Sequence, residues 1–515
     1  MDVFKLLSRG ANIQPKHKEQ LEIFQSKAET SDVNTDFFNK TAKKPRAKQN
    51  IEEGATYAEL DANSQARYRA EHKIKVKGTD IPCPLTSFNY PKLDPVLRRA
   101  LIKHGFETPT PIQSEAIPAL LNGRDLLACA PTGSGKTLGF VLPILQKLID
   151  SDGKHLQALI ITPTRELCGQ IYQIASQLAP RDVVVAEMNK SMLAKLRNNN
   201  AGKRAKMQLL IATPLRLIEA LHQQLVDVSQ VQTLILDESD RLLGEGFVNQ
   251  ADEIIAGCTS ASLVKAIFSA TMPANVEELA ASIMNSPLRV IVGLKEAASE
   301  TVEQKLIYCG NEQGKLTGIR QMLQNGDVVP PILVFVQSIQ RAKALFHELL
   351  YDKVSVDVIH SELTQNQRTK AINSFKNGDT WVLICTDVLA RGIDFQGVNL
   401  VINYDIPPNA QSYVHRIGRT GRAGRAGKGV TFYTKEDMDS LHAVSNVMKQ
   451  SGCEVPEWVL SGKKQRNKRQ IDRAPISTVP KVVKDMKRKR TATIEGSRRR
   501  KAKLDNKVSK ATGSP

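Results

Sequence analysis

Short apolar runs rich in Val, Ile and Leu alternate with helix-like stretches from residue 81 onwards. A nearly continuous apolar run is typical of a strand buried on both faces of a parallel sheet, with a helix crossing over to the next strand. The first set of such runs lies at 126–130, 158–162, 209–213, 233–237 and 265–270. The second set lies at 332–337, 354–360, 381–387, 400–405 and 429–433. Two sets predict two tandem α/β domains, and the cleft between them is a natural place for a ligand.

Polar stretches mark the expected ends of these domains. The first 80 residues contain few apolar clusters, so we expect an extension with local helix and no core of its own. The joint between the domains should follow the strand-like residues 290–293, where the chain turns polar. The predicted units are an extension at 1–80, a first domain at 81–293, a linker at 294–305, a second domain at 306–452 and a flexible tail at 453–515.

The composition excludes several classes of protein. With 41% hydrophobic and 24% charged residues, the chain is ordinary for a soluble globular protein, which argues against wholesale disorder, collagen or a coiled coil. No apolar run approaches the roughly 18 residues of a membrane-spanning helix, and the first residues lack a secretory pattern. The seven scattered cysteines include no CxxC pair, so we expect a reduced intracellular protein without a structural zinc.

The net charge of +19 is concentrated near the end of the chain, because residues 461–515 contain 19 Lys/Arg and 4 Asp/Glu. Such a segment attracts polyanions, and RNA or DNA is the usual partner. The alternative is a solvated tail that serves only solubility or nuclear import.

The strongest local motif is APTGSGKT at residues 130–137, which follows an apolar run and opens a helix-like stretch. That context is the one a phosphate-binding loop requires. Glycines 133 and 135 let backbone N–H groups point at phosphate oxygens, and the helix N-terminus favours negative charge. Lys136 can reach the β- and γ-phosphates, and the Thr137 hydroxyl can help to hold Mg²⁺. The predicted nucleotide-binding residues are Ala130, Pro131, Thr132, Gly133, Ser134, Gly135, Lys136 and Thr137.

A cluster of acids, Asp237-Glu238-Ser239-Asp240, ends the apolar run 233–237. An acid at a strand end beside a phosphate loop is where Mg²⁺ coordination is expected, and Asp237 fits this place. Glu238 can orient or deprotonate a water molecule for attack on the γ-phosphate.

Together with APTGSGKT, five further motifs complete an ordered set: PTREL (163–167), DESD (237–240), SAT (269–271), TDVLARGID (386–394) and HRIGRTGR (415–422). Over roughly residues 85–440 the chain resembles the DEAD-box ATP-dependent RNA helicases, with Ser239 in place of the usual Ala. The resemblance implies two tandem RecA-like domains, ATP and Mg²⁺ as cofactors, RNA as partner and RNA-stimulated ATP hydrolysis.

The resemblance assigns further residues around the nucleotide. GFETPTPIQ (105–113) is similar to the Q motif, in which Gln113 reads adenine, and Phe88 has the spacing of the aromatic ring that stacks on adenine. An amide can pair with adenine and an aromatic ring supplies a stacking face, although Phe88 by itself would more often be a core residue. Asp394 resembles the acid that contacts the ribose.

Other assigned residues couple the two domains. Ser269 and Thr271 match the motif that links hydrolysis to unwinding, together with Asp240. Arg419 and Arg422 resemble arginine fingers that meet the γ-phosphate only when the domains close, so that closure gates hydrolysis. We expect His415 and Arg416 to bridge the domains through polar contacts.

RNA contacts are implied on another face, through residues suited to phosphates and 2′-hydroxyls. They are Thr164, Arg165, Thr213, Pro214, Arg216, Gln337, Ser338, Thr386 and Gly392. Two departures from the family concern this face: Leu215 replaces a glycine, and the usual glycine pair is not evident in residues 188–200.

The opening MDVFKLLSRGAN, the DESD signature, the segment MNKSMLAKLRNN and the basic tail together resemble the fungal Rok-type helicases. That resemblance implies an enzyme of the nucleus and nucleolus. Nothing in the sequence suggests an obligate dimer or a membrane span, so we expect a monomer that is not bound to a membrane. Its partners would be pre-rRNA, small nucleolar RNA and pre-ribosomal proteins, in 18S rRNA maturation. The alternatives are an ATP-gated RNA clamp or assembly scaffold, and a helicase of splicing, export or translation; DNA unwinding is less expected.

Overall fold

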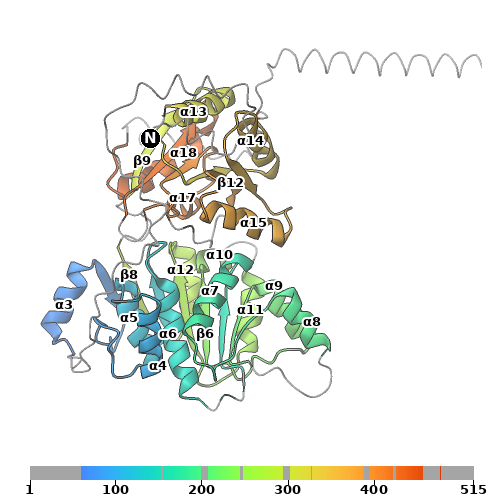
Figure 1. The fold of residues 1–515 in the computed structure, drawn as a ribbon. Helices are drawn as coiled ribbons and strands as arrows, with labels where there is room; N and C mark the ends of the chain where they lie inside the picture. Colours follow the sequence, from blue (N-terminus) through green and yellow to red (C-terminus); the bar gives the residue numbers. More distant parts are fainter. Residues whose placement is uncertain are drawn as a thin grey trace, which may run out of the picture.

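The computed structural model describes residues 59–455 and Ile476, with short gaps at residues 152, 154, 199–206, 244–246, 294–301, 326–327, 388–394, 396 and 422–424. Within these residues the chain forms two α/β domains, drawn one above the other in Figure 1. The expectation of two tandem parallel-sheet domains is therefore confirmed.

The first domain is built on an eight-stranded sheet. Its strands are β1 (Ile74–Lys77), β2 (Leu126–Cys129), β3 (Ala158–Ile161), β4 (Val185–Glu187), β5 (Leu209–Ala212), β6 (Thr233–Asp237), β7 (Val264–Ser269) and β8 (Leu288–Val292). Their spatial order is β1-β8-β2-β7-β6-β3-β5-β4. β1 pairs with β8 in the antiparallel sense, and the other neighbouring strands are parallel.

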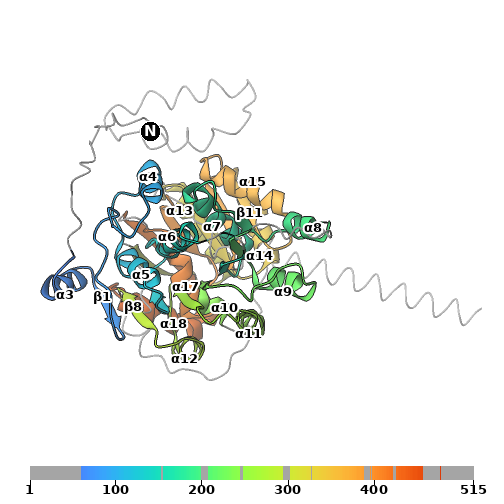
Figure 2. The ribbon, with the colours of Figure 1, turned by 90° about the horizontal axis from the view of Figure 1, so that it is seen from below.

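Helices cover both faces of this sheet. The first face carries α3 (Ala62–Glu71), α4 (Pro95–Lys103), α5 (Pro111–Leu121), α6 (Lys136–Ile149) and α7 (Arg165–Leu178). The other carries α8 (Lys190–Asn198), α9 (Pro214–His222), α10 (Ser239–Leu242), α11 (Val248–Gly257) and α12 (Ala274–Ile283). Figure 2 shows α3 and α8 at opposite ends of the molecule.

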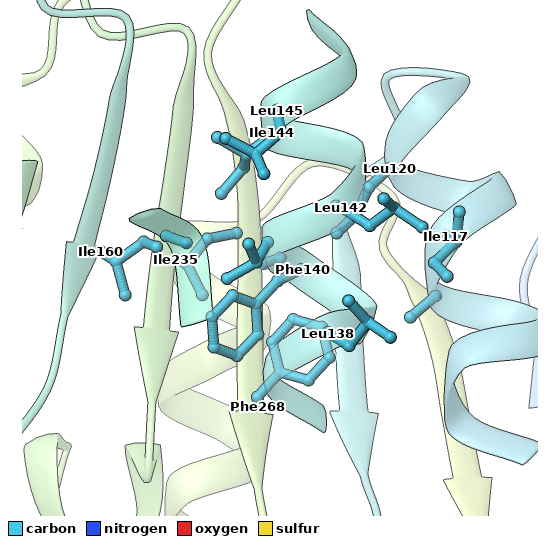
Figure 3. Packing of buried hydrophobic residues seen from close by; sticks show 14 of the residues in the cluster. Ile117, Leu120, Leu138, Phe140, Leu142, Ile144, Leu145, Ile160, Ile235 and Phe268 are labelled. Atoms are coloured by element: carbon cyan, nitrogen blue, oxygen red, sulfur yellow. The ribbon is translucent and has the colours of Figure 1, made fainter. Parts of the chain in front are cut away.

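Successive side chains of a strand enter different cores, because they point to opposite faces of the sheet. Leu126 of β2 belongs to the core under α5 and α6, whereas Leu127 belongs to the core under α9 and α11. In the first of these cores Phe140 of α6 packs edge-to-face on Phe268 of β7, with ring centroids 5.0 Å apart (Figure 3). Burial on both faces explains why these strands read as continuous apolar runs.

The second domain repeats the plan with six parallel strands in the order β11-β12-β10-β13-β14-β9. These are β9 (Val302–Tyr308), β10 (Ile332–Val336), β11 (Val356–Ile359), β12 (Val382–Thr386), β13 (Leu400–Asn403) and β14 (Gly427–Tyr433). Its helices are α13 (Glu312–Gln324), α14 (Ile339–Tyr351), α15 (Gln365–Lys376), α17 (Ala410–Ile417), the short 3₁₀ helix η3 (Lys435–Asp437) and α18 (Met438–Gln450). In Figure 1, α15 and α17 lie on the side of this domain that faces the first domain.

Three expected boundaries differ from the observed ones. The sheet of the first domain begins before residue 81, because β1 adds an antiparallel edge strand whose alternating Ile-Lys-Val-Lys pattern is too short to stand out. The second sheet begins at Val302, inside the expected linker. Ile476, inside the expected tail, is only 6% exposed and joins the core cluster that contains α13 and α14. The rest of the tail lies outside the described residues, as do residues 1–58 of the extension.

No helix among the described residues is long and apolar enough to cross a membrane. All seven cysteines are described, and all are free thiols.

Candidate functional site between the two domains

The loop after β2 has the backbone of a phosphate cradle. Gly133 and Gly135 adopt left-handed φ angles of +78° and +86°. A Cβ atom at Gly135 would lie 2.4 Å from Gln113 Nε2, so glycine is required both by the backbone angle and by this close approach. α6 starts directly afterwards at Lys136, so the unpaired N–H groups of its first turn belong to the same loop. Residues 130–137 can therefore surround phosphate oxygens with N–H donors.

Lys136 is the cation of this loop. Its Nζ atom donates hydrogen bonds to the carbonyl oxygens of Ala130 (2.7 Å) and Pro131 (3.0 Å). Loss of water around the ammonium group lowers the pKa of Lys136, and the nearby negative charge of Asp237 opposes that shift. An anionic ligand in the loop would favour the ammonium form, since opposite charge offsets the missing water.

Asp237 is the last residue of β6 and Glu238 follows it, and both lie near Lys136. Burial, followed by the negative charge of Glu238, raises the pKa of Asp237 to about 7, against the attraction of Lys136. Glu238 adopts a φ of +50°, a left-handed conformation that few non-glycine residues take up. Its Oε2 atom is buried and has no hydrogen-bond partner among the described residues. A strained residue with an unsatisfied carboxylate oxygen is typical of a site that acts on a ligand.

The oxygens at this place suit a magnesium ion bound together with phosphates. Mg²⁺ prefers carboxylate and hydroxyl oxygens, and Thr137 and Asp237 supply one of each. A nearby cation would keep Asp237 ionised, since positive charge lowers the pKa of a carboxylic acid. Glu238 would then face the same region with an oxygen open to a water molecule. The residues present therefore fit both the triphosphate and its metal ion.

Gln113 connects helix α5 to the phosphate loop. Its Oε1 atom accepts a hydrogen bond from Thr110 N (3.0 Å), and its Nε2 atom donates one to Gly135 O (2.9 Å). Thr110 Oγ1 also donates to Ser134 O (2.7 Å). The side chain of Gln113, which is expected to read adenine, therefore contacts the loop that would hold the phosphates.

Phe88, which is expected to stack on adenine, is a buried residue. It is 6% exposed and belongs to the hydrophobic core of the first domain. A stacking platform needs an uncovered ring face, so the structure favours the core reading of Phe88.

A chain of hydrogen bonds crosses from the first domain to the second. Thr271 Oγ1 donates to Asp240 Oδ2 (2.6 Å), and His415 Nε2 of α17 lies 2.5 Å from the same oxygen. Ser269 Oγ donates to Thr271 O (2.6 Å), which continues the chain to the end of β7. The expected coupling residues Ser269, Thr271, Asp240 and His415 are thus brought together, although their positions lie up to 175 residues apart in the sequence.

A second crossing contact involves the phosphate loop itself, because Thr132 Oγ1 donates to Gly418 O (2.9 Å). Arg419 follows Gly418 and is 2% exposed, with its Nε atom donating to His415 O (3.1 Å). This places Arg419 in the buried zone beside the phosphate loop, where an arginine finger is expected. Arg422, the second expected arginine finger, and Asp394, the expected ribose contact, lie outside the described residues.

Arg416 does not bridge the domains through its hydrogen bonds, which corrects the expectation. Its guanidinium forms a two-point ion pair with Asp387 (2.5 and 2.7 Å) and donates to Asp405 O (2.7 Å). It also lies over the ring of Phe335, 5.2 Å from the centroid. All these partners belong to the second domain, because Arg416 points into that domain and its neighbour His415 points across the interface.

The residues expected to bind RNA in the first domain lie at two helix N-termini. Thr164 caps α7, where its Oγ1 atom accepts from Leu167 N (3.4 Å), and Arg165 follows with an exposed side chain. Thr213 precedes α9, which begins with Pro214. Arg216 lies in the first turn of α9 and donates to Glu219 Oε2 (2.6 Å). Leu215, at the position of the family glycine, is 62% exposed.

A cleft of about 650 Å³ lies beside these helices and is lined by both domains. Three of the expected residues, Arg165, Thr213 and Arg216, contribute to its wall. The second domain contributes α15, including Gln365 and Asn366, which sequence reasoning did not single out. Thr364, just before α15, and Gln367 in its first turn form a capping box. This pattern marks only the start of a helix, so no chemical motif pointed to this wall.

A third crossing contact closes one side of this cleft, because Arg368 Nη1 of α15 donates to Glu166 Oε1 of α7 (3.1 Å). Gln337, Ser338 and Thr386, also expected to bind RNA, lie at the ends of β10 and β12 but do not line the cleft. Ser338 caps α14 by accepting from Arg341 N (3.3 Å). Gly392 lies outside the described residues.

Comparison with known protein families gives two matches. Residues 110–279 match the DEAD/DEAH box helicase model, and residues 314–424 match the helicase conserved C-terminal domain. The curated relatives include ATP-dependent RNA helicase ROK1 of Lodderomyces elongisporus, 47% identical over 97% of this chain and 99% of the relative. ATP-dependent RNA helicase ROK1 of Saccharomyces cerevisiae is 46% identical, over 94% of this chain and 95% of the relative.

Comparison with solved structures agrees with these family matches. S. cerevisiae Dbp5 bound to RNA and ADP BeF3 has a TM-score of 0.64 and 27% identity, over 72% of this chain and 94% of that one. Mss116p bound to ssRNA and AMP-PNP has a TM-score of 0.63 and 26% identity, over 74% of this chain and 82% of that one. The matching models and the relatives, which extend over nearly the whole chain, establish that the protein belongs to the DEAD-box helicase family.

Proposed function

We propose that this DEAD-box RNA helicase uses ATP to open or remodel short duplexes of pre-rRNA, including those with small nucleolar RNA. The work would serve 18S rRNA maturation and small-subunit assembly in the nucleolus, with pre-ribosomal proteins as partners. Support comes from the similarity over nearly the full length to relatives named ROK1. The basic residues 461–515 suit a polyanionic partner.

The observation that carries the mechanism is the hydrogen-bond chain from Thr271 through Asp240 to His415. Asp240 lies two residues after Glu238, whose charge acts on Lys136 of the phosphate loop, and His415 belongs to the second domain. A change of charge at the phosphates can therefore be transmitted to the second domain through a short, buried set of contacts. The domains would close when ATP and RNA bind and separate after hydrolysis.

The residues of the site divide the chemistry between them. Bound Mg²⁺ would neutralise phosphate charge and supply a Lewis acid. Residues 130–137 would bind the phosphate oxygens, with Lys136 contributing its ammonium charge. Glu238 would orient the attacking water and accept its proton through the open Oε2 atom. Arg419 would approach from the second domain and stabilise the charge of the transition state only when the domains are together.

The RNA side of the cycle follows from the same closure. A cleft shared by two domains fixes one strand in a shape that a regular duplex does not match, so the second strand is released. Each duplex step costs about 1–2 kcal/mol, so one closure opens only a few base pairs. We therefore expect local strand separation, and unwinding of a long duplex without loss of rate would contradict this mechanism.

The first test is ATP hydrolysis by the purified protein with and without RNA, beside Lys136→Ala and Glu238→Gln. RNA should stimulate hydrolysis strongly, and both substitutions should abolish it while Glu238→Gln retains ATP binding. Negligible hydrolysis in the presence of RNA would contradict the helicase mechanism. The pre-rRNA assignment is tested separately by crosslinking the protein to RNA in cells and by 18S precursor levels after its depletion.

A second candidate is an ATP-gated RNA clamp, in which the closed state is the function. The contacts that cross between the domains favour it, because they stabilise the closed arrangement directly. Glu238→Gln discriminates the two: it should support growth if clamping suffices and fail if turnover is needed.

A further inference from the structure

A hollow of about 810 Å³ lies in the first domain, at the edge of the sheet opposite the phosphate loop. Its wall is formed by the residues that come just before β2, β3, β6 and β7, together with the end of α6 and Asn285 ahead of β8. The phosphate loop and Asp237 lie at the carboxyl ends of the same parallel strands. The hollow is therefore separate from the nucleotide site and from the cleft that the two domains share.

Lys147, in the last turn of α6, supplies a cation to this hollow. Its side chain is half-buried, and its ammonium group forms no hydrogen bond or ion pair with any residue that the structure describes. Burial lowers the pKa of Lys147, because the ammonium group loses water without gaining a negative charge beside it. A charge that is taken out of water without a partner is costly, so a ligand that supplies a negative group here is favoured.

The other charged groups of the wall already have partners. Arg124 donates to backbone carbonyl oxygens, the closest at 2.8 Å, and lies 3.8 Å from the exposed carboxylate of Asp80. Asp125 accepts from two backbone N–H groups at 2.7 and 2.8 Å, and Asp150 accepts from the amide of Gln146 at 3.1 and 3.2 Å. The two cations and two acids of the wall balance in number, so the hollow as a whole does not attract a polyanion. It offers one unpaired cation to one negative group.

Amide side chains complete the wall. Gln157, Gln232 and Asn285 line the hollow, and their side-chain amides have no hydrogen-bond partner within the part of the chain that the structure describes. Each such amide carries both a donor and an acceptor, so it can pair with the C=O and N–H groups of a peptide. The hollow thus combines one cation with groups that suit a peptide backbone.

We propose that this hollow docks an acidic segment of a partner protein, with one aspartate or glutamate carboxylate of that segment paired with Lys147. The amides of the wall hold the peptide groups on either side of that residue. A single unpaired cation suits a single carboxylate, whereas the phosphate backbone of RNA is held by several cations together. Because the hollow belongs to the first domain alone, the partner can stay bound whether the two domains are together or apart.

The test is the rate at which individual lysines of the full chain are acetylated by a water-soluble N-hydroxysuccinimide ester, followed by mass spectrometry. The probes, at matched ionic strength, are a capped glycine peptide containing two glutamates, the same peptide with glutamines, inorganic phosphate and a short single-stranded RNA. Lys103, the last residue of α4, is the control, because it is exposed and does not line the hollow. In a second arm, Lys147→Gln and Lys103→Gln are compared for binding of the glutamate peptide by calorimetry and for RNA-stimulated ATP hydrolysis.

We expect about 10 mM of the glutamate peptide to slow acetylation of Lys147 roughly threefold or more, since one charge-assisted contact with a few amide bonds gives millimolar affinity. Acetylation of Lys103 should not change, and the glutamine peptide should protect neither lysine. Lys147→Gln should remove the heat of peptide binding and leave ATP hydrolysis unchanged, whereas Lys103→Gln should retain both. Equal acetylation of Lys147 with and without the glutamate peptide would overturn the inference, as would stronger protection by phosphate or RNA, and either result would leave the helicase assignment intact.

Discussion

Removing the hydrogen bond between His415 and Asp240 tests whether closure of the domains limits hydrolysis. His415 is 2% exposed and Asp240 is 6% exposed, so water does not readily replace either partner. The perturbation is His415→Ala, with Asp240→Asn and the double substitution completing a cycle. His442→Ala, on α18, is the control for loss of a histidine outside the interface.

The expected size follows from the geometry. The distance between His415 Nε2 and Asp240 Oδ2 is 2.5 Å, and the acceptor is a carboxylate. A hydrogen bond to a charged group contributes about 1.5–3 kcal/mol, and its loss here also leaves a buried carboxylate with one partner fewer. If the bond forms only in the closed state, the RNA-stimulated kcat should fall by roughly 10- to 150-fold. ATP affinity without RNA should change little, since His415 belongs to the other domain.

The assay is steady-state ATP hydrolysis with saturating RNA, combined with ATP binding in its absence. In the double substitution the loss should be close to that of either single one, because both remove the same bond. Losses that simply multiply would refute the reasoning, as would a His415→Ala enzyme as active as His442→Ala.

Other outcomes follow from single features of the structure. Ile476→Ala should destabilise the second domain by about 2 kcal/mol or more, measured by thermal unfolding, because it removes a buried side chain. Truncation after residue 480 should leave this stability unchanged, but it should flatten the salt dependence of RNA binding. Gly135→Ala should abolish ATP binding in a fluorescent-nucleotide assay, because alanine at a φ of +86° is strained and meets Gln113. Arg368→Gln should weaken the coupling between the two ligands. The factor by which ATP raises RNA affinity and the factor by which RNA raises ATP affinity should fall equally, as measured by binding in the Glu238→Gln background.

The sequence predicted the strands well wherever both faces of the sheet are buried. Stretches such as 158–161 and 234–236 are apolar throughout because successive side chains enter two different cores. β1 was missed because an edge strand needs only one apolar face, and its identity depends on pairing with β8, more than 200 residues away. Burial of Ile476 was missed for the same reason, since the core cluster that it joins includes residues of α13 and α14, which lie far away in the sequence.

The candidate site was predictable where one short motif supplies all the atoms. Residues 130–137 carry their glycines, lysine and hydroxyl within one loop, so their chemistry is visible in the sequence. Side-chain direction was not predictable: His415 and Arg416 are neighbours, yet one contacts Asp240 across the interface and the other pairs with Asp387 inside its own domain. The wall formed by α15 was missed because its role depends on the approach of two domains, which no local pattern records.

Each of the three interdomain hydrogen bonds described above connects the second domain to a residue next to one of the proposed ligands. Thr132 belongs to the phosphate loop, Asp240 follows Glu238, and Glu166 follows Arg165 of the RNA cleft. The nucleotide side and the RNA side are therefore stabilised by one and the same approach of the domains. A ligand that favours this approach must raise the affinity for the other ligand, and thermodynamic linkage requires the two effects to be equal. The hydrogen bonds of Arg368 go to Leu363, Glu166 and Ser361, none of which belongs to the phosphate loop, so a loss of nucleotide coupling on its replacement would arise through closure.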